Sequence, residues 1–217
     1  MGPIWTDTDR TYMGSTNIDV LVVVDMQEDF ISGIFGSKEA KDIVPEVIVE
    51  IDRFITKGGE RGTQNPHVFF TRDTHDKNSY MHGSESYLPF HCGKDTEGWE
   101  LNNRIKAAVT SLQDKDACTI IDKYTFGSVE LGQAVKKYID EKIAYLRSTG
   151  VPANRINENI EIVGLCTDIC VISNALLLKA FIPSARIMVN SSLCAGTTPE
   201  NHSKALDIIG QNGIEVI

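Results

Sequence analysis

Four kinds of reactive side chain follow successive apolar segments of this chain. Asp25 ends the first segment, Asp73 and His75 follow the second, Lys123 ends the third, and Cys170 follows the fourth. An acid, an imidazole, an amine and a thiol can together perform acid–base and nucleophilic chemistry. Each of them alone is more often a solvated loop residue, a helix cap or a core residue. The prediction of an active site therefore depends on their convergence at one place.

Cys170 closes the segment Gly164–Cys170, in which an apolar strand leads into a helix. If Thr167 is the N-cap of that helix, Cys170 lies in its first turn, where free backbone N–H groups and the helix dipole stabilise a thiolate. The N–H groups around Cys166 and Cys170 are then candidates for an oxyanion hole. The alternatives are a small buried hydrophobe or a redox pair with Cys166, which lacks CxxC spacing. The nucleophile hypothesis depends on the acid and the lysine at neighbouring strand ends.

Six short segments rich in β-branched and apolar residues predict the strands that carry these groups. They are continuous rather than alternating, which is typical of strands buried on both faces of a parallel sheet. The predicted strands are 19–25, 67–71, 117–121, 161–165, 185–189 and 214–217. Helical periodicity marks the segments between them, which are 44–57, 100–112, 129–146, 168–180 and 199–209. This alternation predicts an open, mostly parallel α/β sheet whose strands deliver the reactive residues to one carboxyl edge.

The overall composition is that of an ordinary globular protein, with 41% hydrophobic and 24% charged residues among 217. The formal net charge of −9 argues against nucleic acid or an anionic membrane as a partner. We find no apolar run of membrane-spanning length, roughly 18 residues, and no signal peptide. Five cysteines without small-scaffold spacing predict reduced thiols and a cytoplasmic protein. We expect a loose N-terminal arm over residues 1–17, one domain over 18–217, and a surface loop over 147–159.

Three segments resemble the signatures of isochorismatase-like cysteine hydrolases. They are Val22–Phe30, Asp122–Phe126 and Gly164–Cys170. The third is the most specific, and the resemblance runs from about Asp19 to the C-terminus. It implies a three-layer α/β/α, Rossmann-like sandwich with a six-stranded sheet, and a cis peptide between Leu165 and Cys166. It also implies a homo-oligomer, since members of this family often form dimers or tetramers.

The resemblance assigns a role to each of the three central residues. Cys170 is the nucleophile, and Asp25 takes the thiol proton and later gives it to the leaving amine. Lys123 favours the thiolate and orients the pair, and the reaction passes through an acyl-enzyme that water hydrolyses. The resemblance also implies a substrate pocket with three apolar walls, which are Phe30, Leu88 and Phe126.

Within this family, Asp73, His75 and His91 resemble the metal site of nicotinamidases. One carboxylate and two imidazoles suit a divalent ion with open positions, zinc first, with iron or manganese as alternatives. The fourth contact is open among His82, Glu85 and Ser84, and ungapped counting back from His91 favours Ser84. The implied role of the ion is to bind a pyridine nitrogen and hold the carboxamide over Cys170. The alternative is an ordinary loop in which Asp73 acts as a cap.

These residues lead to one expected activity and several alternatives. We expect hydrolysis of a small carboxamide, nicotinamide, to nicotinate and ammonia, which serves NAD salvage. The alternative is a metal-independent amidase of the same superfamily that acts on an N-carbamoyl or ureido compound. Isochorismate hydrolysis is disfavoured because that branch does not use a cysteine nucleophile. A thiol redox sensor or a non-enzymatic scaffold needs only Cys170 and leaves Asp25 and Lys123 unexplained.

Overall fold

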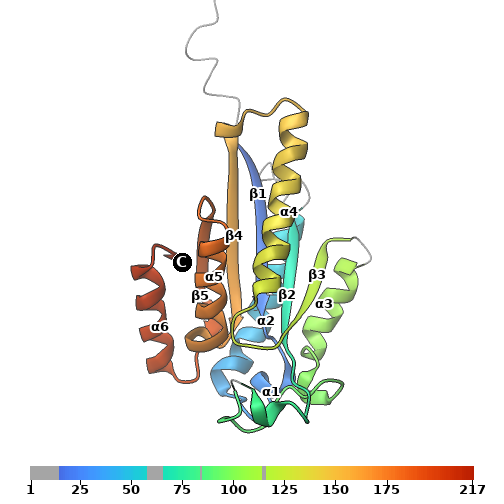
Figure 1. Ribbon diagram of the computed structural model, residues 1–217, viewed down its shortest axis with the longest axis vertical. Coiled ribbons are helices and arrows are strands. Elements are labelled where there is room, and N and C mark those ends of the chain that lie inside the picture. Colours follow the sequence, from blue (N-terminus) through green and yellow to red (C-terminus); the bar gives the residue numbers. More distant parts are fainter. Residues whose placement is uncertain (1–14, 58–65, 84, 114–115) are drawn as a thin grey trace, which may run out of the picture.

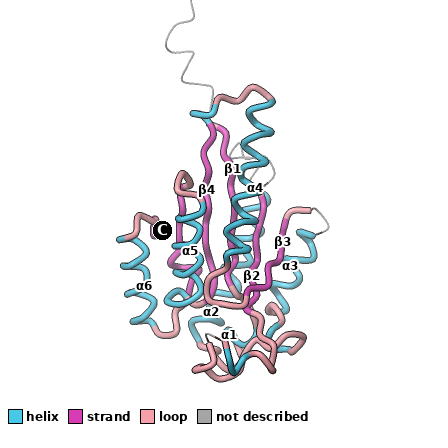
Figure 2. Tube along the Cα trace, in the orientation of Figure 1, coloured by secondary structure: helices cyan, strands magenta, loops and turns pink. Residues whose placement is uncertain are grey.

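The computed structural model describes residues 15–57, 66–83, 85–113 and 116–217. In these ranges six strands form one parallel sheet with helices on both faces (Figure 1, Figure 2). The strands are β1 Thr16–Val24, β2 His67–Asp73, β3 Cys118–Lys123, β4 Ile156–Leu165, β5 Arg186–Ala195 and β6 Glu215–Val216. The helices are α1 Glu28–Ile31, α2 Lys38–Lys57, α3 Asn103–Gln113, α4 Val129–Ser148, α5 Ile172–Phe181 and α6 Pro199–Gln211. The predicted three-layer α/β/α architecture is confirmed.

Short helical turns complete the description of the chain. Three are 3₁₀ turns, and the fourth is a π-helical turn that runs directly into α5. They are η2 Tyr80–His82, η3 Glu97–Trp99, η4 Ala153–Arg155 and η5 Thr167–Val171. Among the described residues, no helix combines the length and apolar character that a membrane crossing requires.

The order of the strands places a crevice at the centre of the sheet. The order is β3-β2-β1-β4-β5-β6, so the chain winds outward from β1 in one direction and from β4 in the other. In doubly wound sheets ligands bind outside the carboxyl ends of the strands where the winding reverses. Here that point lies between the ends of β1 and β4, beside α1 (Figure 1). Asp25 follows β1 and Cys166 follows β4, so both border this crevice.

The packing of the core explains why the sequence of β1 is a continuous run of apolar residues. Leu21 and Val23 pack in the cluster that includes α2 and α3. Val20, Val22 and Val24 pack in the cluster that includes α4 and α5. Alternate side chains therefore enter the two layers of helices, and both faces of the strand exclude water.

The sheet is longer at its amino edge than the sequence indicates. Thr16 pairs in register with Ile156, so β1 and β4 begin together. Residues 156–159 of the predicted surface loop are therefore strand, and so are the last two residues of the predicted arm. Apolar patterning misses these positions because all of them except Ile156 carry polar side chains, at the partly exposed end of the sheet. Residues 1–14 of the arm lie outside the described residues.

The helix starts follow capping rules. Thr198 is the N-cap of α6, and its hydroxyl accepts a hydrogen bond from the N–H of Asn201, with Pro199 in the first turn. Helix α2 begins six residues before the predicted start, at Lys38. The Ser37 hydroxyl accepts a hydrogen bond from the N–H of Ala40, which stabilises this earlier first turn.

Candidate active site

The side-chain nitrogen of Lys123 is the point at which the candidate catalytic residues meet. Its Nζ lies 2.8 Å from Asp25 Oδ2 and donates a hydrogen bond of 3.5 Å to Cys170 Sγ. Lys123 and Asp25 have no exposed surface, and Cys170 is 4% exposed. A buried ammonium requires negative or polarisable partners. The two contacts of Lys123 therefore hold the carboxylate of Asp25 and the thiol of Cys170 next to the same cation.

The backbone and a threonine hold Asp25 in place. Asp25 adopts a φ of 48°, a left-handed conformation that costs roughly 1–3 kcal/mol for a non-glycine residue. Thr71 compensates, because its hydroxyl donates to Asp25 Oδ1 at 2.6 Å and accepts from the Asp25 N–H at 3.2 Å. Burial raises the pKa of the Asp25 carboxyl, although the Lys123 charge acts in the opposite direction. A raised pKa suits a carboxylate that must accept a proton near neutral pH.

Cys170 lies in the π-helical turn η5 rather than in the first turn of a regular α-helix. The N-cap position is Cys166, and Thr167 is the first residue of the turn. The Thr167 hydroxyl pairs with His202 Nδ1 at 2.8 Å, so the conditional assignment of Thr167 as the N-cap is wrong. Burial raises the pKa of the Cys170 thiol well above its ordinary value, and Lys123 opposes this effect. In the free protein the thiol therefore holds its proton until a base removes it.

The end of β4 brings Cys166 to the same crevice. The peptide bond between Leu165 and Cys166 is cis, as expected. Just before it, Gly164 has a φ of 116°, and a Cβ at this position would lie 2.2 Å from the carbonyl oxygen of Val24. Only glycine permits this approach of β4 to β1. Cys166 and Cys170 both line the cavity described below, and the oxyanion hole formed by their N–H groups remains a prediction.

Four buried side chains form a candidate metal site next to Lys123. One ligand atom from each of Asp73, His75, Glu85 and His91 lies within 4.8 Å of the others. Asp73 Oδ2 is 3.0 Å from His75 Nε2 and 3.1 Å from His91 Nε2. Both oxygens of Glu85 are buried without a hydrogen-bond partner among the described residues. Two carboxylates and two imidazoles with unsatisfied oxygens fit a divalent cation of the zinc, iron or manganese type.

The fourth member of this group is Glu85, one of the three candidates for the fourth contact. The Tyr80 hydroxyl lies within 3.0 Å of the carbonyl oxygens of Glu85, Leu88 and Pro89. This folds the loop around Tyr80 and turns the Glu85 side chain inward, a closure that counting along the sequence does not reveal. Ser84 lies outside the described residues. His82 is exposed and does not belong to the group.

A second layer of contacts orients the candidate ligands. His91 Nδ1 lies 2.9 Å from the carbonyl oxygen of Pro89, which fixes the proton on Nδ1 and leaves Nε2 to face the group. Gln27 accepts a hydrogen bond from the Asp73 N–H, and its amide donates to the carbonyl oxygens of Asp73 and Trp99. Sequence reasoning missed Gln27, although it stands two residues after Asp25 in the first signature.

Charge within the group is balanced by protons when no ion is bound. Burial lowers the pKa of His75 and of His91, but the carboxylates of Asp73 and Glu85 more than offset this and raise each pKa to about 9. Burial raises the pKa of the Asp73 carboxyl, but Lys123 and the two imidazoles lower it by more. The net result is a pKa well below the ordinary value of a carboxyl. A divalent cation would replace those imidazole protons, because metal ligands must be deprotonated.

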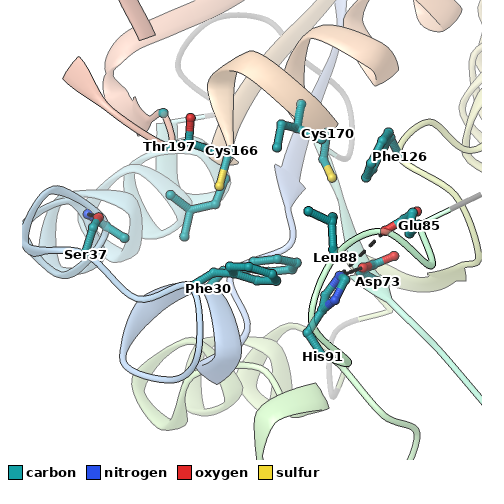
Figure 3. A pocket seen from close by; sticks show the side chains of 15 residues that line it. Phe30, Ser37, Asp73, Glu85, Leu88, His91, Phe126, Cys166, Cys170 and Thr197 are labelled. Carbon is teal, nitrogen blue, oxygen red and sulfur yellow. Dashed lines mark hydrogen bonds and ion pairs between the residues drawn. The ribbon is translucent and has the colours of Figure 1, made fainter. Parts of the chain in front are cut away.

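A cavity of about 180 Å³ joins the two sets of residues, and we call it the apolar cavity (Figure 3). Cys170, Asp73, Glu85 and His91 lie at one end, and Ser37 and Thr197 lie at the other (Figure 3). Its volume is below the roughly 300–1,000 Å³ of sites for drug-sized ligands, so it suits a small, compact substrate. The three predicted apolar walls, Phe30, Leu88 and Phe126, all line it.

Comparison with known proteins places the chain in a family. The Isochorismatase domain model matches residues 19–217. A curated relative is PncA of Bacillus subtilis strain 168, described as an uncharacterized isochorismatase family protein. It is 25% identical over 189 residues, which cover 86% of this chain and 91% of PncA.

Solved structures agree with this fold. The nicotinamidase/pyrazinamidase PncA from Bacillus subtilis has a TM-score of 0.68 at 24% identity, covering 92% of this chain and 98% of that one. A pyrazinamidase of Pyrococcus horikoshii in complex with zinc has a TM-score of 0.61 at 25% identity, covering 92% and 98%. An N-carbamoylsarcosine amidase from Thermoplasma acidophilum has a TM-score of 0.59 at 20% identity, covering 92% and 95%.

Proposed function

The chain belongs to the isochorismatase family of hydrolases, and from this premise we propose that it is a metal-assisted cysteine amidohydrolase that converts nicotinamide to nicotinate and ammonia. One observation carries the proposal. Three members of the four-ligand group, Asp73, Glu85 and His91, border the same small cavity as Cys170. Lys123 Nζ joins the two sets, because it contacts both Asp73 Oδ1 and Cys170 Sγ. An amidase that needs no metal has no use for this second set of ligands.

The catalytic proposal assigns each step to a residue of this chain. Asp25 removes the thiol proton, and Cys170 Sγ attacks the carboxamide carbon, while the Lys123 charge stabilises the anionic state. Asp25 then returns the proton to the amide nitrogen, ammonia leaves, and a thioester acyl-enzyme remains. Water deprotonated by Asp25 hydrolyses this thioester and releases nicotinate. N–H groups of Cys166 and Cys170 are the proposed donors to the oxyanion.

The metal group contributes to substrate position. When bound by Asp73, His75, Glu85 and His91, a divalent ion supplies a Lewis-acid contact for the pyridine nitrogen and draws electron density from the ring. We propose zinc first, with iron or manganese as alternatives, because the donor set suits each of them. Phe30, Leu88 and Phe126 are the proposed walls around the ring.

The second candidate function is a metal-independent amidase that acts on an N-carbamoyl or ureido compound. It is favoured by the arrangement of Asp25, Lys123 and Cys170, which contains the whole nucleophilic apparatus without any metal ligand. The buried oxygens of Glu85, which have no hydrogen-bond partner among the described residues, argue against it, since burying a polar group without such a partner is costly.

The cellular compartment, the partners and the oligomeric state of this enzyme are also proposals. All five cysteines are free thiols, which supports a reducing compartment such as the cytoplasm. The proposed partner is the small carboxamide alone, without nucleic acid or membrane, in a homo-oligomer of this chain.

A direct assay tests the function. Ammonia release from nicotinamide is measured with purified protein, before and after treatment with a chelator, and with Cys170→Ala as the blank. We expect release that requires Cys170, falls on chelation and returns with added Zn²⁺, Fe²⁺ or Mn²⁺. No release by metal-loaded wild-type protein would exclude nicotinamide, and carbamoyl and ureido compounds would then be assayed in its place.

A further inference from the structure

A second cavity reaches the metal group from outside the apolar cavity. It measures about 420 Å³ and is lined by the end of β2, by η2 and by Tyr124 after β3, and we call it the polar cavity. Of these two cavities, His75 lines the polar one, whereas Asp73 and His91 line the apolar one. Glu85 lines both. The four ligands therefore form the partition between two separate cavities.

The two cavities differ in what they offer to a hydrated cation. Phenylalanine, leucine, isoleucine and alanine side chains dominate the walls of the apolar cavity. A divalent ion that passed this way would lose its water without replacement, which is costly. The polar cavity instead presents the carboxylate of Asp76, the hydroxyl of Ser79 and the imidazole of His82, all exposed. These groups can replace lost water one ligand at a time.

Glu85 lies at the inner end of the polar cavity, next to the other metal ligands. Its side chain is only 2% exposed, yet neither carboxylate oxygen has a hydrogen-bond partner among the described residues. The nearest imidazole nitrogens, those of His75 and His91, lie 3.4 Å and 3.6 Å from Glu85 Oε2. This carboxylate lies in the wall of the polar cavity together with His75, so an ion from this side would meet these two permanent ligands before Asp73 and His91.

We propose that the polar cavity is the route by which a divalent cation enters and leaves the site, separate from the route of the carboxamide. Asp76 attracts the ion at the mouth, His82 binds it transiently, and Glu85 and His75 pass it to Asp73 and His91. This inference rests on the proposed function in one respect, which is that the four-ligand group binds a divalent ion. It implies that metal exchange continues while the apolar cavity is blocked.

Metal exchange kinetics test the route without reference to turnover. Zn²⁺ uptake by metal-free protein and extraction by a chromogenic chelator are followed in a stopped-flow instrument. In Ser79→Trp the indole obstructs the polar cavity, so we expect both rates to fall by about tenfold with an unchanged Kd. The kcat of Ser79→Trp that has been loaded with metal should equal that of the wild type. Labelling Cys170 with a maleimide, verified by mass spectrometry, should leave both rates unchanged.

Two charge variants provide the matched comparison. Asp76→Asn keeps the oxygen that accepts hydrogen bonds from the N–H groups of Asn78 and Ser79 but removes the negative charge. We expect Zn²⁺ uptake by Asp76→Asn to slow by about threefold to tenfold at low salt. Glu200→Gln removes an equal charge from an exposed position three residues after Thr197, which lines the apolar cavity, and should leave uptake unchanged.

The possible failures are distinguishable. Slow exchange after labelling of Cys170, with wild-type rates in Ser79→Trp, would overturn the separate route and direct the ion through the apolar cavity. A decrease in uptake by Glu200→Gln that equals the decrease by Asp76→Asn would overturn it as well. If the wild-type chain takes up no divalent ion, both this inference and the metal-assisted function are overturned.

Discussion

Asp73 and Lys123 are register partners at the ends of β2 and β3, and Lys123 Nζ lies 3.1 Å from Asp73 Oδ1. The other oxygen of Asp73 faces the Nε2 atoms of His75 and His91. One carboxylate thus contacts the catalytic lysine with one oxygen and the metal group with the other. The two halves of the candidate active site are therefore mechanically and electrostatically joined.

Removal of the shared lysine should destabilise the fold as well as abolish activity. Lys123→Met leaves the buried carboxylates of Asp25 and Asp73 without their cation, which typically costs about 3–5 kcal/mol of the free energy of unfolding. Urea denaturation measures this loss. As a control, Lys136→Met removes an exposed pair with Asp140 and should change the same quantity by less than about 1 kcal/mol. Equal effects of the two substitutions would contradict a buried ionic link.

The identity of the fourth metal contact can be decided by a pair of variants. Glu85→Ala removes a carboxylate from the group and should weaken Zn²⁺ binding by about tenfold to a hundredfold. Ser84→Ala, the change at the neighbouring position, should leave Zn²⁺ affinity at the wild-type value. Competition with a zinc indicator gives both dissociation constants. Weaker binding in Ser84→Ala alone would restore the assignment that ungapped counting favours.

Gln27 should act on the metal site through the backbone. Gln27→Ala leaves the N–H and the carbonyl of Asp73 and the carbonyl of Trp99 without their buried partner. Each lost buried hydrogen bond costs about 1–3 kcal/mol, so we expect a lower free energy of unfolding together with weaker Zn²⁺ binding. Gln27→Glu keeps the acceptor but loses both donated bonds, and should show an intermediate Zn²⁺ affinity. Wild-type Zn²⁺ affinity in both variants would show that Gln27 does not position Asp73.

Some residues of the candidate site could be placed from the sequence alone, and others could not. Asp25 and Lys123 could be placed together because apolar runs end at them and parallel strands share a carboxyl edge. Glu85 could not, because its direction depends on a loop folded around the Tyr80 hydroxyl. The contact between Asp73 and Lys123 depends on strand register, and apolar patterning does not determine register.

Patterning also fails where structure is made by polar residues. The amino ends of β1 and β4 consist mostly of polar residues, some of which pair with one another, such as Asn17 and Asn157. Gln27 resembles any loop glutamine until its three buried backbone partners are known. The apolar core and the reactive residues at the carboxyl ends of the strands were predictable, and the hydrogen bonds that hold the site in shape were not.

The reactivity of Cys170 should report its buried setting. Burial raises the pKa of its thiol well above the ordinary value, so little thiolate is present at neutral pH. Alkylation requires the thiolate, and the rate at Cys170 should therefore still rise about tenfold per pH unit near pH 9. Mass spectrometry after iodoacetamide treatment of metal-free protein measures this rate between pH 6 and 10, with glutathione as the reference thiol. A plateau below pH 8 would mean that the resting nucleophile is already a thiolate.

The stability of the metal-free protein and the extra stability gained on metal binding should depend on pH with opposite signs. In metal-free protein the pKa values of His75 and His91 are raised to about 9, from 6.5 for an ordinary imidazole. Their protonation therefore stabilises the fold below pH 6.5, and this contribution is lost as the pH rises through about 9. Metal binding must displace these protons, so the apparent Zn²⁺ affinity should fall by up to about a hundredfold per pH unit below pH 9.

Thermal unfolding at pH 6, 7.5 and 9 gives both trends. We expect the metal-free melting temperature to fall as the pH rises, and the increase on addition of Zn²⁺ to be largest at pH 9. His75→Gln retains a polar side chain but lacks the imidazole proton, and should reduce both slopes. An equal reduction of both slopes in His82→Gln would contradict the assignment, because His82 lies on the wall of the polar cavity and outside the four-ligand group.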